Sequence, residues 1–386
     1  MPTRRELLAM TGAIAVAGDG PGALATETEV AARDSSPSLT AAIAALPRRI
    51  AFGSCAHQDK PQPIWDAVLA SEPDLFIFLG DNIYGDTRDP QVLRAKYAQL
   101  AGKPGFKRLR ERVPVLATWD DHDFGENDAC ADYPLKEESR RIFCDFWGEP
   151  ADSPRRQRDG IYHSVVYDSS GTRLQILLPD LRFNRTPIRK RDLDRSTYRD
   201  WSKRLEREGR EVPGPYEREP NAGASMLGER QWQWLEGELS KPADLRILAS
   251  SLQVVADFPG WEAWINYAQD HQHLIETLRR QRASGLVCLS GDTHYAEFSR
   301  LDVNVPYPLW DFTSSGLTET WPVTPPNARR QSAVLREANF GLLQIDWQGP
   351  RTTLAVEVRD VSGKVRLAQQ LALADLRPSN PGSDFP

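Results

Sequence analysis

Five carboxylates and one histidine lie within the twelve residues ATWDDHDFGEND, which run from Ala117 to Asp128. The stretch follows the apolar run VPVLAT, which predicts a buried strand that ends where the charges begin. Carboxylates packed this closely repel one another, and burial makes the repulsion more costly unless a cation neutralises it. The stretch is therefore a candidate cation-binding site.

Three other predicted strands end in residue types that bind metals. The first is followed by Cys55 in GSC, the second by Asp81 and Tyr84 in GDNIY, and a later one by Asp292 and His294 in GDTH. In an open α/β sheet, ligands bind at the edge where the carboxyl ends of the strands meet. Glycine before the acidic residue lets the backbone turn sharply out of the sheet. The four motifs together predict one site.

Each motif taken alone has a simpler structural explanation. Gly-Asp after a strand is often only a turn, and Asp-Asp-His-Asp can cap a helix. If Asp81, Asp121 and Asp292 converge in one cleft, however, their mutual repulsion requires bound metal. The mixed thiolate, carboxylate and imidazole set suits a transition metal on one side, and the carboxylate-rich side suits calcium, magnesium or manganese.

The hydrophobic pattern predicts the elements that position these motifs. Strands and helices alternate through most of the chain and are followed by a run of strands, which favours an α/β sandwich with two sheets and outer helices. The expected strands are 49–55, 75–80, 113–119, 162–167, 173–178, 245–250, 285–290, 340–347, 352–358 and 365–371. The expected helices are 64–72, 90–102, 135–147, 231–239 and 270–282.

The composition argues against two classes of function. The chain has 386 residues, 40% of them hydrophobic, and a formal net charge of −6. Binding nucleic acid through its phosphates needs a basic surface, so we expect no nucleic-acid platform. No apolar run reaches the roughly 18 residues that span a bilayer, so we expect no transmembrane segment.

The N-terminus resembles a twin-arginine export signal. Arg4 and Arg5 precede a small-residue, mostly apolar segment, and ALA at 23–25 offers a cleavage site. The alternative is a basic terminus without a targeting role. An export signal implies recognition by the twin-arginine export machinery and a periplasmic or secreted location.

We expect four parts along the chain: a signal at 1–25, a flexible leader at 26–47, one catalytic domain at 48–373 and a flexible tail at 374–386. Within the domain, the segment 182–219 is dense in charges of both signs. It is either a solvated helical excursion or a mobile cover over the site. An oxidising compartment would allow a Cys130–Cys144 disulfide, but the sequence does not fix that pairing.

The motifs GSC, FLGDNIYGD, TWDDHDFGEND and SGDTH, in this order and at these intervals, resemble the alkaline phosphatase D (PhoD) branch of the calcineurin-like metallophosphoesterases. The resemblance extends from about Arg49 to Val358. It implies the metallophosphoesterase type of α/β sandwich and a hydrolase that acts on phosphate esters with two metal ions, Fe(III) and Ca2+, with Mn2+ or Mg2+ as alternatives.

Carried over residue by residue, the resemblance implies an iron side of the site. Cys55 stands where the broader superfamily opens with Asp-x-His, and its implied role is a thiolate ligand of iron. Tyr84 matches the tyrosinate ligand, His294 falls on the same side, and Asp81 would bridge the two metals.

The second metal side is implied by the remaining motifs. Asp121 matches the metal-binding Asn of the superfamily's Gly-Asn-His motif, and His122 matches its catalytic histidine. Asp292 replaces the first His of the Gly-His-x-His motif, which makes this side harder and favours calcium. Asp120 is expected to orient His122 or to cap the following turn, and the other acidic residues of the stretch are expected to be supporting or loop residues.

Two metal ions can clamp a phosphate and lower the pKa of a bridging water, so that a metal-bridged hydroxide attacks phosphorus in line. His122 would then stabilise the transition state or protonate the leaving alkoxide. Arg182 is a candidate for holding the non-bridging oxygens, because a guanidinium matches phosphate geometry. The alternative is that Arg182 pairs with Asp180 as a structural contact.

The leading prediction is an exported phosphomonoesterase or phosphodiesterase whose partner is a small-molecule phosphate ester. The alternatives are a phospholipase-like phosphodiesterase that acts on lipid head groups and an exported metal-binding protein without catalysis. Trp261, Trp264 and Trp310 are expected in loops, where they line an apolar substrate pocket or pack in the core. His57 is expected near the pocket rim.

Overall fold

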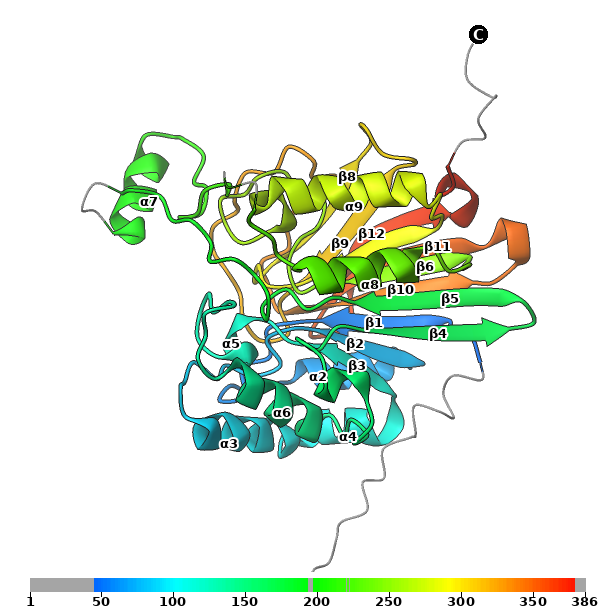
Figure 1. Cartoon of the computed structure of the whole chain (residues 1–386), viewed down its shortest axis with the longest axis horizontal. Helices are drawn as coiled ribbons and strands as arrows, with labels where there is room; N and C mark the ends of the chain where they lie inside the picture. Colours follow the sequence, from blue (N-terminus) through cyan, green and yellow to red (C-terminus); the bar gives the residue numbers. More distant parts are fainter. Residues whose placement is uncertain (1–44, 194–196, 220, 222, 379–386) are drawn as a thin grey trace, which may run out of the picture. The chain divides into compact units, whose positions relative to one another are not determined.

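The computed structural model describes residues 45–193, 197–219, 221 and 223–378. Within these residues the strands form two six-stranded mixed sheets, with helices on their outer faces (Figure 1). The predicted two-sheet α/β sandwich is therefore confirmed. The predicted signal at 1–25 and most of the predicted leader lie outside the described residues.

The first sheet joins the N-terminal strands of the sandwich to the C-terminal ones, in the order β12-β11-β10-β1-β2-β3. Strands β1, β2 and β3 run parallel, whereas β10, β11 and β12 continue the sheet as antiparallel neighbours. The strands are β1 (Arg49–Gly53), β2 (Leu75–Leu79), β3 (Val115–Thr118), β10 (Asn339–Asp346), β11 (Thr353–Asp360) and β12 (Val365–Ala372).

The second sheet has the order β4-β5-β6-β7-β9-β8, with a parallel centre and one antiparallel strand at each edge. Its strands are β4 (His163–Ser169), β5 (Thr172–Leu178), β6 (Leu245–Ala249), β7 (Leu286–Ser290), β8 (Ala296–Leu301) and β9 (Leu309–Ser314). The hairpin of β4 and β5 was predicted, but β8 and β9 were not. Polar residues interrupt the apolar pattern of both missed strands, among them Glu297 and Asp311, which are buried.

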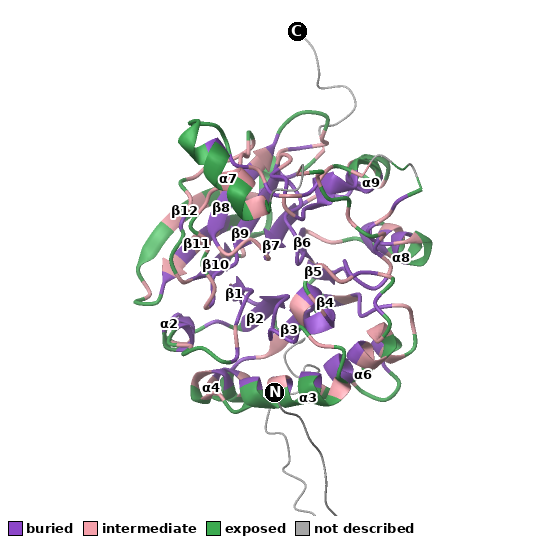
Figure 2. Ribbon diagram, turned by 90° about the vertical axis from the view of Figure 1, so that its left-hand side faces the viewer, coloured by how far each residue is buried: buried purple, intermediate pink, exposed green. Residues whose placement is uncertain are grey.

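Helices pack on part of the outer face of each sheet (Figure 2). The first sheet is covered by α2 (Ile64–Ala70), α3 (Pro90–Ala101), α4 (Pro104–Arg112) and α6 (Lys136–Phe146), and the second by α8 (Glu229–Leu239) and α9 (Ala268–Arg280). Helix α4 is absent from the sequence prediction, because its sequence PGFKRLRER carries only two apolar anchors. None of the described helices combines the length and the apolarity needed to cross a bilayer.

Strand β2 shows why the central strands read as continuous apolar runs. In its sequence LFIFL, Leu75, Ile77 and Leu79 pack in a cluster shared by both sheets. Phe76 and Phe78 point to the opposite face and pack with residues of the outer helices. Both faces of the strand are therefore buried, as expected for a parallel strand covered on two sides.

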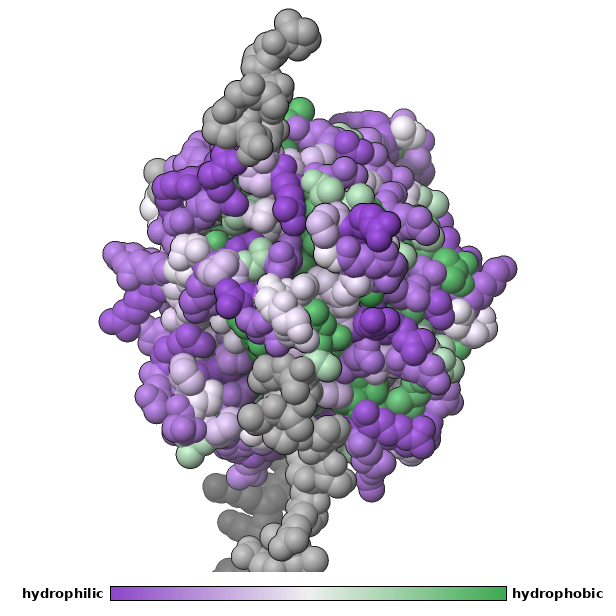
Figure 3. Space-filling model, turned by 90° about the vertical axis from the view of Figure 1, so that its right-hand side faces the viewer, coloured by the Kyte–Doolittle hydropathy of each residue, from purple (hydrophilic) through white to green (hydrophobic). Residues whose placement is uncertain are grey.

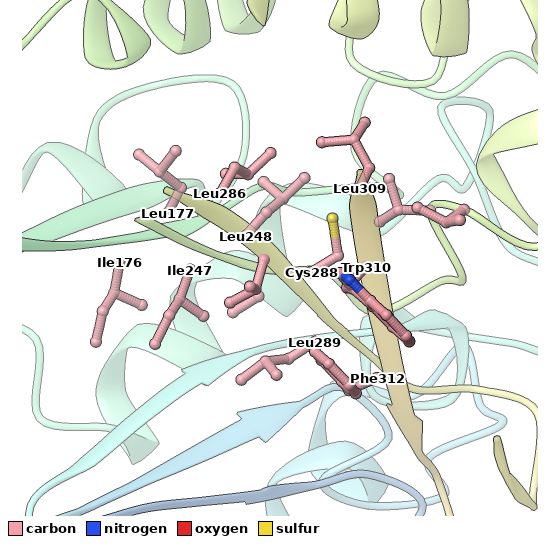
Figure 4. Packing of buried hydrophobic residues seen from close by; sticks show 14 of the residues in the cluster. Ile176, Leu177, Ile247, Leu248, Leu286, Cys288, Leu289, Leu309, Trp310 and Phe312 are labelled. Carbon is pink, nitrogen blue, oxygen red and sulfur yellow. The ribbon is translucent and has the colours of Figure 1, made fainter. Parts of the chain in front are cut away.

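Two of the three tryptophans that were expected in loops, Trp264 and Trp310, are buried in the hydrophobic core. Figure 4 shows side chains from β5, β6, β7 and β9 packed together, with the ring of Trp310 stacked on Phe312 at 5.7 Å between centroids. Trp310 therefore lies in β9, and its predicted place in a loop is wrong. Trp264 lies in a short 3-10 helix (Trp264–Asn266) and is fully buried.

The packed part of the chain extends past the predicted domain boundaries at both ends. The Pro47 carbonyl accepts a hydrogen bond from Trp347 Nε1, and Leu376 is buried while its carbonyl accepts from Gly285 N. These contacts place residues of the predicted leader and tail in the sandwich.

The four cysteines are buried free thiols in the structure. Cys130 Sγ donates to Asp132 Oδ1 at 3.1 Å, and Cys144 Sγ donates to the Arg155 carbonyl. The Cys130–Cys144 disulfide that the sequence allows is therefore not formed here.

The carboxyl ends of the parallel strands of both sheets lie at one edge of the sandwich, which faces the viewer in Figure 2. The segment 182–219 also lies on this side, and it contains the largely exposed helix α7 (Tyr198–Arg207). The opposite edge is mostly hydrophilic, with apolar residues in small separate groups (Figure 3). The loops that carry the candidate metal ligands, which follow β1, β2, β3 and β7, therefore all lie at one edge of the sandwich.

Candidate metal and active site

The six predicted metal ligands come together at the carboxyl edge of the strands. Cys55 follows β1, Asp81 follows β2, Asp121 begins the short helix α5 (Asp121–Phe124) after β3, and Asp292 follows β7. Tyr84 lies three residues after Asp81, and His294 lies two residues after Asp292. The juxtaposition that the strand-end motifs predict is present, while the individual roles of the residues stay predictions.

The backbone at the site adopts a conformation that non-glycine residues avoid. Positive φ angles occur at Cys55 (63°), Asp81 (48°), Asp292 (69°) and His294 (59°). Such left-handed residues each cost free energy and persist where the surrounding structure holds them, commonly at functional sites. Turning the chain this way directs the four side chains back toward one another.

Gly80 allows the loops after β2 and β3 to approach closely. It has a φ of +96°, and a Cβ placed there would lie 2.6 Å from the Asp120 Cβ. Gly291 does the same for the second sheet, since a Cβ there would lie 2.6 Å from Ser54 Oγ. The glycines before Asp81 and Asp292 are thus required by crowding between loops.

One group of ligand atoms combines sulfur, oxygen and nitrogen. Atoms of Cys55, Asp81 and His294 lie within 4.8 Å of one another. Cys55 Sγ donates to Asp81 Oδ2 at 3.3 Å, and the Tyr84 hydroxyl is 2.9 Å from His294 Nε2. Burial, reinforced by Asp81, raises the pKa of the Cys55 thiol well above its ordinary value, and burial lowers the pKa of His294 to about 4.

A second group is formed by carboxylates. Oxygens of Asp81, Asp120, Asp121 and Asp292 also lie within 4.8 Å of one another. Burial raises the pKa of Asp81 and of Asp292 well above the ordinary value, and the neighbouring carboxylates add to this rise. Burial also raises the pKa of Asp120 to about 6, although Arg182 opposes the change.

His122 is oriented by a residue that the sequence reasoning did not single out. Its Nδ1 lies 2.7 Å from Asp86 Oδ1, and its ring packs on Tyr84 with 4.2 Å between centroids. Asp120 does not bond to His122 but stands at the N-cap of α5, so of its two expected roles the structure shows the capping one. Asp86 ends the motif FLGDNIYGD, and its place in that motif was the available signal. Burial would lower the pKa of His122, but Asp121, Asp81 and Asp86 raise it to about 11.

Asp123 ties the two acidic loops together. Its Oδ1 accepts from Asp120 N at 2.7 Å, and its Oδ2 accepts from Asn82 N at 3.1 Å. Because Asn82 follows Asp81 directly, one buried carboxylate fixes the backbone beside two candidate ligands. Burial raises the pKa of Asp123 to about 7 despite these donors. Asp123 therefore has the supporting place expected of it.

Arg182 does not lie where a substrate ligand is needed. Its side chain is fully buried, donating from Nε to Asp120 and from both terminal nitrogens to Glu262. Arg185 binds the same Glu262 carboxylate. Asp180, the alternative partner, accepts from the backbone N–H of Arg182 and not from its guanidinium. The expected role of Arg182 as a phosphate ligand is therefore wrong, because Arg182 belongs to a buried ion-pair network beneath the site. The sequence around Glu262 contains no signal that predicts this network.

A cavity of about 290 Å³ opens beside these residues. Its lining comprises Asp121, His122, Asn127, Asp128, Tyr216, Trp261, Glu262, Asp292, Thr293, His294, Tyr295, Trp321 and Pro325. None of the described lining residues is Lys or Arg. His57, expected near the rim, stacks on Tyr84 at 4.7 Å and does not belong to this lining. Apart from His122, whose raised pKa favours its charged form, a phosphate in the cavity would therefore need cations from another source.

The side chains present fit two metal ions. The buried oxygens Asp81 Oδ1 and Asp120 Oδ2 have no hydrogen-bond partner among the described residues. Orphaned buried carboxylate oxygens are costly, and a bound cation removes that cost. The sulfur-containing group has the donors of a transition-metal site, and the carboxylate group has those of a harder cation. Asp120, which the sequence reasoning placed outside the ligand set, belongs to the second group.

Known proteins resemble this chain in sequence and in fold. A family model described as PhoD-like phosphatase matches residues 50–349. Alkaline phosphatase D of Bacillus subtilis (strain 168) is 24% identical over 290 residues, which make up 66% of this chain and 47% of that protein. The chain thus spans about half the length of the curated relative it matches.

Two solved structures show the same fold. One, titled as the structure of PhoD, has a TM-score of 0.62 and 17% identity, covering 87% of this chain and 72% of that chain. The other, described as GAP50, the anchor in the inner membrane complex of Plasmodium, has a TM-score of 0.50 and 11% identity, covering 88% and 91%. These likenesses concern the fold. Since the family model covers most of the sandwich and all four strand-end motifs, the chain belongs to the PhoD-like phosphatase family.

Proposed function

We propose that the protein is an exported, metal-dependent hydrolase of phosphoric monoesters or diesters. The observation that carries the proposal is the meeting of two ligand groups, which share Asp81, beside a cavity that His122 lines. Family membership supports the same reaction class. Export is supported by the Arg4-Arg5 pattern of the sequence and by the signal-like segment after it.

The proposed metals follow from the donor types. Cys55, Tyr84 and His294, with Asp81, would hold Fe(III), because thiolate, phenolate and imidazole suit a transition metal. Asp81, Asp120, Asp121 and Asp292 would hold Ca2+, or Mn2+ or Mg2+ in its place. When bound, two such cations would neutralise phosphate charge and make an attacking water more acidic.

The protein's own groups have separate tasks in this reaction. The acidic and histidine-bearing floor of the cavity would hold the cations that neutralise the phosphate end, because the described lining contains no Lys or Arg. Asp86 holds His122 at Nδ1, which leaves Nε2 as the nitrogen that faces a ligand. As the bond from phosphorus to the alcohol oxygen breaks, that oxygen takes the proton from His122.

The test compares His122→Ala with wild type of confirmed metal content. We expect phosphate release from aryl phosphates to fall roughly 10²- to 10⁴-fold while both metals are retained. His273→Ala is the matched control, since His273 lies on α9 and bonds to Glu236. Metal-loaded wild type that hydrolyses no phosphate ester would favour the second candidate, an exported metal-binding protein. Full activity of the His122 variant would exclude the proposed acid.

A phospholipase-like phosphodiesterase remains the alternative within the same chemistry. Hydrolysis of an aryl diester and of a phospholipid in mixed micelles would be measured with the same metal-loaded protein. We expect the aryl ester to react faster by kcat/KM, because the cavity of about 290 Å³ is at the low end of the roughly 300–1,000 Å³ typical of ligand pockets. A preference for the lipid would support the alternative.

A further inference from the structure

The cavity beside the candidate metal site has two chemically different sides. Asp121, His122, Asp292 and His294 form the polar floor. The remaining lining has four aromatic side chains; three of them and a proline form what we call the aromatic wall: Tyr216, Trp261, Trp321 and Pro325. None of these four belongs to the motifs from which the site was predicted.

Trp261 is the centre of the aromatic wall. Its ring meets Trp321 edge to face, with 5.7 Å between centroids, and Tyr216 in the same manner at 6.1 Å. Behind it, Tyr198 of helix α7 makes a third such contact at 5.1 Å. Edge-to-face packing is the favourable arrangement of aromatic rings and fixes their orientation. The wall is therefore a preformed surface.

Three separate segments build this surface. Tyr216 comes from the charged segment 182–219, Trp261 from the loop before the 3-10 helix Trp264–Asn266, and Trp321 from the loop after β9. The Trp321 backbone N–H donates to the His294 carbonyl at 2.9 Å, which ties the wall to a candidate metal ligand. This hydrogen bond holds the aromatic wall in a fixed position relative to the polar floor.

The carboxylates nearest the aromatic wall are already neutralised. Asp128 accepts from the Tyr216 hydroxyl and lies 3.3 Å from Lys190 Nζ. Glu262 is bound by two buried arginines, Arg182 and Arg185. The four side chains of the wall therefore offer π faces and apolar area, and none of them carries a charge.

We propose that the aromatic wall is a binding subsite for the alcohol part of the substrate, and that it selects a flat, neutral, apolar group such as a phenyl ring. The inference rests on the proposed function, which puts the phosphate on the floor. A cavity of about 290 Å³ has room for a phosphate and one group of ring size. Aromatic faces stack favourably on such a ring and exclude water from it.

The test measures kcat/KM for phenyl phosphate and methyl phosphate in wild type, Trp261→Ala and Trp321→Ala. The ratio of variant to wild type cancels the different intrinsic reactivity of the two esters. We expect each alanine variant to lose roughly tenfold or more on phenyl phosphate and much less on methyl phosphate, the size of effect typical of apolar pocket contacts. Trp261→Phe should recover part of the loss, because it restores an aromatic face.

Trp234→Ala is the control, since Trp234 lies on α8 and contacts Tyr162, away from the cavity lining. It should leave the ratio of the two esters unchanged. Metal content and thermal unfolding are measured for every variant, and Trp261→Phe with Trp321→Ala carry the test if Trp261→Ala does not fold.

Failure of the subsite and failure of the proposed function give different results. If wild type hydrolyses neither ester with metals bound, the proposed function fails. If both esters react and the phenyl-to-methyl ratio is the same in wild type and variants, the subsite is overturned. A second pair of esters tests neutrality: 3,3-dimethylbutyl phosphate and phosphocholine have the same shape, and preference for the cationic ester would overturn selection of a neutral group.

Discussion

The Arg182 guanidinium and the Glu262 carboxylate form a two-point ion pair in complete burial, with Nη1–Oε1 at 3.0 Å and Nη2–Oε2 at 2.8 Å. The third nitrogen of Arg182 donates to Asp120, a member of the carboxylate group. Glu262 directly follows Trp261 in the chain. One buried cation therefore links the loop after β3, which carries candidate metal ligands, to the loop that carries Trp261 of the aromatic wall.

Breaking this pair should be costly. Glu262→Gln leaves Arg182 and Arg185 without their shared counter-charge, and removing one partner of a buried pair typically costs about 3–5 kcal/mol. We expect a loss of this size in the free energy of unfolding, measured by denaturant titration. The exposed pair of Arg210 and Glu208 is the control, and Glu208→Gln should cost no more than about 1 kcal/mol. Equal effects of the two substitutions would contradict a special role for the buried network.

Gly80→Ala tests the crowding between the acidic loops. The new Cβ would meet the Asp120 Cβ at 2.6 Å, so the loops must separate and metal affinity should fall at least tenfold. Gly171→Ala is matched, because Gly171 also has positive φ but no atom within 4 Å of the new Cβ. The control should lose only the roughly 1–2 kcal/mol of a left-handed alanine and keep its metal affinity. Titration calorimetry and thermal unfolding would separate the two effects.

Asp292→Asn should have opposite effects on the metal-free and metal-loaded protein. Without metal, burial and neighbouring carboxylates raise the pKa of Asp292. Ionisation of this side chain is therefore less favourable in the folded than in the unfolded protein, which lowers stability near pH 7. The chelated variant should therefore melt a few degrees higher than chelated wild type, at about 2–4 °C for each kcal/mol gained. In excess metal the order should reverse, because the variant lacks a ligand oxygen. If the variant melts lower in both states, repulsion among the carboxylates is not the governing effect.

Tyr84→Phe should change the colour of iron-loaded protein. A phenolate or thiolate bound to ferric iron gives a visible charge-transfer band, and loss of the Tyr84 oxygen should weaken or shift it. Tyr97→Phe is the matched control, because Tyr97 is buried and bonds to Asp123 outside the ligand groups. Absorption spectra are compared at equal iron content. Colourless wild type with stoichiometric iron would remove Tyr84 and Cys55 from the ligand set.

His271 should make the protein less stable in acid. Burial, together with Arg329, lowers the pKa of this histidine to about 4, whereas an unfolded histidine has a pKa of about 6.5. The unfolded chain therefore binds more protons between these values, so the stability present above pH 6.5 is lost as the pH falls toward 4. The slope from His271 approaches about 1.4 kcal/mol per pH unit.

His271→Asn should flatten the pH dependence of the unfolding free energy by this amount, as measured by denaturant titration at several pH values. Thr277→Val on the same helix is the control, because Thr277 is fully buried and does not titrate. Its effect should be the same at every pH. An unchanged slope in the His271 variant would show that the acid sensitivity arises elsewhere.

Local sequence determined the elements and the composition of the candidate metal site. Apolar runs such as LFIFL predicted strands, and Gly-Asp at their ends predicted sharp turns. Because parallel strands end at a common edge, residues separated by more than 200 positions, such as Asp81 and Asp292, were expected together and lie together. Strands β8 and β9 were missed because their buried polar residues find partners only in the folded chain; Asp311, for example, accepts from the backbone of Val254 and Val255.

The partners of the polar side chains were decided by the tertiary structure. Arg182 was a candidate for phosphate binding because a guanidinium matches phosphate geometry, but its side chain is buried against Asp120 and Glu262. The pairing of Asp86 with His122 was likewise not predictable, because it depends on how two loops pack against each other. Sequence alone thus fixed which residue types end each strand, because backbone preference and hydrophobic pattern are local. The choice of contacts among those residues came from packing, because side chains from distant segments compete for the same small volume.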